Sequence, residues 1–145
     1  MSAPVFPDSP TVLAARERAR ARIADSGAAT DASTRDFSER LLRSFLALCE
    51  NPRTRQGVLR LVRSSVGSAR AGRALYQVLN RTVVNPAARA TGVQASALRL
   101  ELVAGQLVGL AMMRYVVQLE PVASAPAEDV VRQFAPAVRA TLKSS

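Results

Sequence analysis

Residues 101–142, with the sequence ELVAGQLVGLAMMRYVVQLEPVASAPAEDVVRQFAPAVRATL, decide the fold class of this chain. We interpret the region as a long, almost wholly apolar helix over Ser96–Leu119, a proline-marked elbow, and an amphipathic helix over Ala127–Leu142. The first of these helices carries apolar side chains on nearly every face, so it must be buried on nearly every side. One side can face the core of the chain itself, and we expect the other side to face a second subunit.

The composition of the whole chain favours helices over strands. Hydrophobic residues make up 48% of the 145 positions, but aromatic residues make up only 4% and tryptophan is absent. A core built from alanine, valine and leucine suits close packing between helices better than a sheet of β-branched and aromatic strands. We therefore predict an all-α domain of about five helices over residues 36–145.

Three further helices are indicated before the quoted region. Apolar side chains recur at helical spacing over residues 37–49, 58–66 and 75–83. We expect the first of these helices to begin at an N-cap near Ser33 or Thr34 and the third to stop at Asn85-Pro86. Residues 1–35 are rich in arginine, alanine and proline, and we expect them to be flexible or weakly helical, with a loop over residues 25–34.

The chain is basic, with nineteen arginines and one lysine against eleven acids and a net charge of +9. Fifteen of the arginines lie in residues 1–95, where they are scattered rather than gathered in one dense block. An excess of this size attracts nucleic acid or anionic membranes. The alternative explanation is a GC-rich genome, in which arginine replaces lysine throughout, and both explanations stay open at this point.

Residues for catalysis or metal binding are scarce. Histidine is absent, the single cysteine, Cys49, lies in an apolar run, and there is no glycine-rich phosphate loop. We therefore expect no enzyme activity, no catalytic residues, no metal site and no cofactor. The apolar run Leu102–Val117 is too short for a membrane span and contains Gln106 and Arg114, and the N-terminus lacks the apolar stretch of a signal peptide. We expect a cytoplasmic protein that does not contact membranes.

Three segments carry a resemblance to a known family: Phe45–Leu48 with Asn51-Pro52, then Gln106–Pro121, then Val130–Leu142. Over residues 37–142 the chain resembles the C-terminal effector-binding and dimerisation domain of tetracycline-repressor-like (TetR) transcriptional regulators. The resemblance implies a homodimer in which the last two helices form a four-helix bundle with the same helices of a second subunit. It also implies that the inner faces of the other helices line a cavity for a small hydrophobic effector.

The expected dimer interface lies on the last two helices. Gly105 and Gly109 form a small-xxx-small pattern that permits close approach of two helices, either across a dimer seam or inside one subunit. The residues that we expect at the interface are Leu102, Gly105, Gly109, Met112, Val116, Val130, Phe134 and Val138.

The expected effector-binding residues lie on the inner stripe of each helix. They are Phe45, Leu59, Val62, Tyr76, Leu79, Leu110 and Met113. Tyr76 is a lone polar tip on an apolar stripe, so we expect its hydroxyl to bond to the ligand. The alternatives are that Tyr76 is a half-exposed surface ring and that Met113 fills a gap in the core.

A helix-turn-helix module, the DNA-binding part of such regulators, is not recognisable in residues 1–35. We therefore expect no specific DNA binding by this chain alone. It would act as a ligand sensor, or as a dimerisation partner that modulates a DNA-binding relative by forming a heterodimer with a full-length regulator. The alternative is a minimal regulator that binds nucleic acid nonspecifically through an arginine-rich N-terminal arm. Arg16 and Arg20 would share one face of a helical arm, but Arg18 and Arg22 would lie roughly opposite, which speaks against this alternative.

Overall fold

The computed structural model of the protein describes residues 27–143, with side chains from residue 31 onward. Its described part is all-α and contains no strand, which confirms the predicted fold class. Two short π-helical segments each continue an α-helix. In chain order the elements are α2 (Gly27–Glu50), α3 (Arg55–Ser65), α4 (Ala69–Leu79), η1 (Asn80–Val84), α5 (Asn85–Thr91), α6 (Ala97–Ala111), η2 (Met112–Val116) and α7 (Ala127–Lys143).

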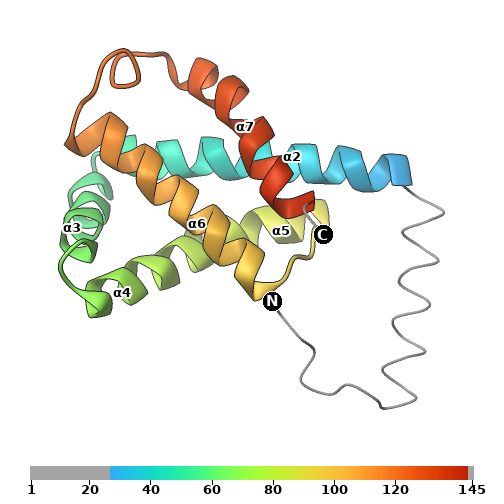
Figure 1. Cartoon of the computed structure of the whole chain (residues 1–145), viewed down its shortest axis with the longest axis horizontal. Coiled ribbons are helices and arrows are strands. Elements are labelled where there is room, and N and C mark those ends of the chain that lie inside the picture. The colour runs from blue at the N-terminus through green and yellow to red at the C-terminus, as the bar shows by residue number, and fades with distance from the viewer. Residues whose placement is uncertain (1–26, 144–145) are drawn as a thin grey trace.

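The long helix α2 contacts α3, α5, α6 and α7, whereas α4 packs mainly on α3 (Figure 1). Helix α7 crosses α2 and makes its largest interface with it, and α5 packs on α2 as well. Helices α3 and α4 pack against each other and form the opposite end of the molecule from the α2–α7 crossing. Helix α6 touches α7 along one flank and α3 and α4 along the other, so it lies between the two halves.

One hydrophobic core joins these helices. Helix α2 contributes Phe37, Leu41 and Phe45, all fully buried, at the i, i+4, i+8 spacing that places them on one face. This face meets the buried sides of α6 and α7. Cys49, from the apolar run, is also fully buried, and burial raises the pKa of its thiol to about 12.

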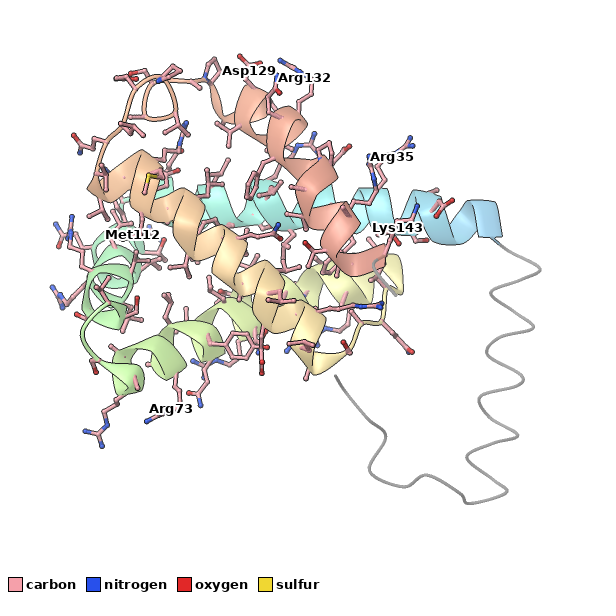
Figure 2. All side chains as sticks on the ribbon, viewed as in Figure 1. Arg35, Arg73, Met112, Asp129, Arg132 and Lys143 are labelled. Carbon is pink, nitrogen blue, oxygen red and sulfur yellow. The ribbon has the colours of Figure 1, made fainter. Side chains whose placement is uncertain are left out.

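Helix α2 begins earlier than its apolar pattern predicted. Ser33 and Thr34 lie inside the helix rather than at its N-cap, and residues 27–34 are helical instead of forming a loop. Alanine is frequent in this segment and favours a helix. A tertiary contact also reaches this segment, because Lys143 of α7, labelled in Figure 2, pairs with the exposed Asp31 at 2.8 Å.

The prediction that a helix stops at Asn85-Pro86 is wrong. The chain stays helical through η1 and α5, and ends at Gly92, whose φ of 75° is the left-handed conformation that terminates many helices. In η1 the Asn85 N–H bonds to the Asn80 carbonyl, a wider turn than in an α-helix. Helix α5 begins after this wider turn, so Pro86 lies in the first turn of α5, where its missing N–H costs little.

The last two helices occupy nearly the predicted ranges. The hydroxyl of Ser96 caps α6 by accepting from the Arg99 N–H at 3.3 Å, and α7 runs through Pro136 as expected. The helical path of α6 and η2 stops before Gln118, which has a φ of 57°. Among the residues that the structure describes, no helix is both long enough and apolar enough to span a membrane.

Candidate functional site

The outward face of α6 and η2 is an exposed apolar strip, which we call the outer stripe. It consists of Leu98, Leu102, Gly105, Gly109 and Met113, spaced three or four residues apart and so on one side of the helix. Leu102 is 53% exposed, and Leu98 and Met113 are each 41% exposed. An apolar helical face without a partner in the described chain marks an interaction surface.

The two glycines of the outer stripe face open space. A methyl group added at Gly105 or at Gly109 would meet no atom of the described chain within 4 Å. Close packing inside one subunit therefore does not explain the small-xxx-small pattern. Gly57 and Gly67 also face open space, so what distinguishes Gly105 and Gly109 is their place within the outer stripe.

The predicted interface residues do not all lie on this face. Leu102, Gly105 and Gly109 are exposed, and Met112, Val116 and Phe134 are half-buried against the core. Val130 and Val138 are buried at 7% and 0% exposure, because α7 turns this side toward α2. They therefore belong to the core of the subunit and offer no surface to a second one.

The predicted effector-binding residues separate into two groups. Five of them are buried in the hydrophobic core: Phe45, Leu59, Val62, Leu79 and Leu110. Tyr76 is half-buried, and Met113 lies on the outer stripe rather than on an inner wall, because η2 carries it to the solvent side. Three grooves lie on the surface of the described residues, and Leu59 is the one predicted effector-binding residue that lines any of them.

Arg114 and Tyr115 of η2 form a polar cluster with Glu50 at the end of α2, which we call the Glu50 cluster. The Tyr115 hydroxyl donates to Glu50 Oε2 at 2.5 Å, and Arg114 Nη2 lies 3.3 Å from the same oxygen. Burial raises the pKa of Tyr115, and the hydrogen bond to Glu50 raises it further, so the hydroxyl stays protonated and acts as a donor.

The Arg114 side chain also fixes the loop between η2 and α7. Its Nη1 donates to the carbonyl oxygens of Val122 at 2.9 Å and Ala125 at 2.7 Å. Burial acts to lower the pKa of Arg114, but its hydrogen bonds to Tyr115 and Glu50 outweigh burial and leave the pKa raised. The cluster thus ties α2, η2 and residues 122–125 together through one side chain.

Two grooves meet at the Tyr115 ring. The first, which we call the α3 groove, has a volume of about 520 Å³ and lies between α3 and η2; its lining residues are Arg55, Gln56, Leu59, Arg60, Arg63, Ser64, Tyr115 and Gln118. The second, of about 540 Å³, shares Arg55, Tyr115 and Gln118 with the first and is also lined by Glu50 and Glu120. A smaller groove of about 280 Å³ lies between α2 and α7, where Arg43 pairs with Glu128 at 2.9 Å.

The positive charge of the chain is concentrated in its middle. Residues 51–100 contain nine arginines and no acid, so this region alone carries a charge equal to that of the whole chain. None of these nine arginines is ion-paired with a residue that the structure describes. Arg73, for example, projects from α4 away from the body of the molecule (Figure 2). The arginine count over residues 1–95 did not reveal this block, because that range also contains seven acids, all of which lie before residue 51.

Gln106 of α6 carries an unsatisfied polar atom. Its Oε1 is buried and accepts no hydrogen bond from the described residues. We expect Gln106→Met to raise the free energy of unfolding by about 1 kcal/mol, because an apolar side chain of similar length removes the desolvation cost. Urea denaturation followed by circular dichroism measures the change, with Gln133→Met on the exposed side of α7 as a control. A loss of stability in Gln106→Met would contradict the expectation that the unpaired oxygen destabilises the fold.

Comparison with known proteins gives a family for this geometry. A family model described as tetracyclin repressor-like, C-terminal domain, matches residues 36–142, which is more than half of the chain. The match includes all helices from α3 to α6 and most of α2 and α7. Comparisons with curated proteins and with solved structures found no match.

Proposed function

Because the chain belongs to the family of tetracyclin repressor-like C-terminal domains, we propose that it is a dimerisation and effector-binding module of transcription regulation, without enzyme activity. The observation that carries the proposal is the outer stripe of α6, with two glycines that face open space. Domains of this family typically pair two subunits and bind an effector.

The proposed homodimer packs the outer stripe against the same stripe of a second subunit. A two-fold interface is self-complementary, so one apolar strip on one helix is sufficient to form it. Glycines at the centre of the strip allow the two backbones to approach closely, and the leucines at its start cover the contact. Helix α7 lies beside α6 and would complete a four-helix bundle with its symmetry mate.

The effector and the regulatory partner follow from the same proposal. A small hydrophobic effector would bind among the buried side chains of α2, α3, α4 and α6, with Tyr76 at the border of this region.

Through the outer stripe the chain would also form heterodimers with a full-length regulator and so modulate a DNA-binding relative in the cytoplasm. No helix-turn-helix is recognisable in residues 1–35, so we propose no specific DNA binding by this chain alone. The alternative of a basic N-terminal arm concerns Arg16 to Arg22, which lie outside the described residues.

The oligomeric state of the unmodified chain tests the proposal. We expect sedimentation equilibrium at micromolar concentration to give twice the mass of the 15.5-kDa chain, because the outer stripe is apolar and uncovered in the subunit. Dilution should shift the mass toward that of the monomer, as mass action requires. A monomer at all concentrations would refute the dimer.

A further inference from the structure

The α3 groove has the chemistry of an anion site. Three of its lining residues, Arg55, Arg60 and Arg63, are guanidinium donors, and no carboxylate lines it. None of the three forms an ion pair with a described residue. Two amides and a hydroxyl, from Gln56, Gln118 and Ser64, add neutral hydrogen-bonding groups to the same wall. Guanidinium groups bind carboxylate and phosphate oxygens through paired hydrogen bonds.

The groove is partly built before any ligand arrives. The Tyr115 ring forms one side, and its hydroxyl is held by Glu50 at 2.5 Å. The Arg55 guanidinium carbon lies over this ring at 5.8 Å from its centre, so one of the three arginines already has a preferred position. Leu59, only 3% exposed, lies at the base of the groove between the arginines of α3.

The neighbouring groove limits what the ligand can be. It shares the wall of Arg55, Tyr115 and Gln118 but also carries the carboxylates of Glu50 and Glu120. Arg114 also lines this second groove and pairs with Glu50, so its acids and arginines balance and it offers no excess positive charge to a second anionic group. The volume of about 520 Å³ falls within the range of about 300–1,000 Å³ that is usual for small-molecule sites.

We propose that the α3 groove binds a small organic molecule with a single oxyanion, a phosphate monoester or a carboxylate, whose uncharged part contacts Tyr115. This groove is separate from the buried region proposed for a hydrophobic effector, so the inference goes beyond the proposed function and does not depend on it. The arginines line a concave groove beside a fixed ring, which favours a small ligand over duplex DNA. Nonspecific contact with a DNA backbone needs no groove and no aromatic wall.

Titration of the full chain with phenyl phosphate and with benzoate tests the proposal. Amide and side-chain resonances would be followed by ¹H–¹⁵N NMR, with sodium chloride holding the ionic strength constant. We expect at least one probe to give saturable shifts at Gln56, Gln118 and residues of α3. Saturation by only one of the two probes identifies the oxyanion as phosphate or as carboxylate.

A matched pair of variants distinguishes binding in the α3 groove from nonspecific attraction to the positive charge of the chain. The double variant Arg60→Gln/Arg63→Gln should weaken binding about tenfold or more, since each lost arginine removes charge-assisted hydrogen bonds. The double variant Arg81→Gln/Arg89→Gln removes the same charge from exposed positions outside the groove and should change affinity less than about twofold. NMR peak dispersion would show that both variants are folded.

Three results would overturn the anion site. They are equal losses in the two double variants, no saturable shift with either probe, and binding of a duplex oligonucleotide that depends on Arg60 and Arg63 but is not displaced by either probe. The last result would assign these arginines to a polyanion surface instead. Sedimentation is recorded separately, so a failed anion site and a failed dimer are distinguishable.

Discussion

Replacing Arg114 with alanine is expected to lower the free energy of unfolding by about 3 kcal/mol, because hydrogen bonds to charged groups contribute about 1.5–3 kcal/mol each and do not add fully. The Arg114 side chain is only 8% exposed and contacts Glu50, Tyr115 and two backbone carbonyls. Its loss would leave the Val122 and Ala125 carbonyls without this donor, leave Glu50 bonded, among the described residues, only to Tyr115, and open a hole between α2, η2 and the loop that follows. Urea denaturation monitored by circular dichroism measures the change.

Two variants make this expectation specific. Arg132→Ala removes an arginine that also has an acidic partner, Asp129, but whose side chain is 68% exposed, and it should cost no more than about 1 kcal/mol. Arg114→Lys keeps the charge but has one donor group instead of the planar fork, so it should recover only a minor part of the loss. Equal stability of Arg114→Ala and Arg132→Ala would contradict a structural role for the Glu50 cluster.

The Glu50 cluster could not be predicted from the sequence. In the apolar helix Arg114 stood out only as a charge that excluded a membrane span. Its partner Glu50 is 64 residues away, at the end of another helix, and no local spacing connects the two. Its other acceptors are backbone carbonyls, which every residue has. Only the fold brings these groups together.

Helix existence was predictable, whereas some helix ends were not. Periodic apolar residues predicted five of the helices, and the predicted starts of the last two, Ser96 and Ala127, lie within one residue of the observed starts at Ala97 and Ala127. The sequence did not predict that the helix continues through Asn85-Pro86, because the π-helical turn before the proline shifts the backbone hydrogen bonds by one residue. The early start of α2 was missed because its support, the pair of Lys143 with Asp31, is a contact between the two ends of the described chain.

The orientation of the last two helices was predicted only in part. Because α6 is apolar on most sides, its sequence does not tell which side faces the core. The glycine spacing left two placements open, and the structure has Gly105 and Gly109 on the exposed side of α6. In α7 the most regular apolar stripe was assigned to a partner, but Val130 and Val138 cover α2 instead. An amphipathic stripe in a small domain is needed first for the domain's own core.

Replacing Gly109 with glutamine is expected to weaken the homodimer by about 30-fold or more, since disruption at the centre of an interface commonly costs about 2 kcal/mol or more. The added side chain would stand between the two α6 helices and hold their backbones apart. Within the subunit it meets no atom at its first carbon, so the fold should be unaffected. Glutamine is also a better helix former than glycine by roughly 0.5 kcal/mol or more, so the monomer should be at least as stable. Sedimentation equilibrium over a dilution series measures the dissociation constant.

Gly57→Gln provides the matched control. Gly57 is also a helical, exposed glycine with no neighbouring atom within 4 Å, but it lies on α3, away from the outer stripe. It should leave the dissociation constant unchanged while giving the same gain in helix propensity. If the two variants dimerise equally well, the α6 glycines do not lie in the interface, and another surface must hold the subunits together. If only Gly109→Gln dissociates, and its unfolding free energy per subunit is kept, the open space beside Gly109 is the place where the second subunit packs.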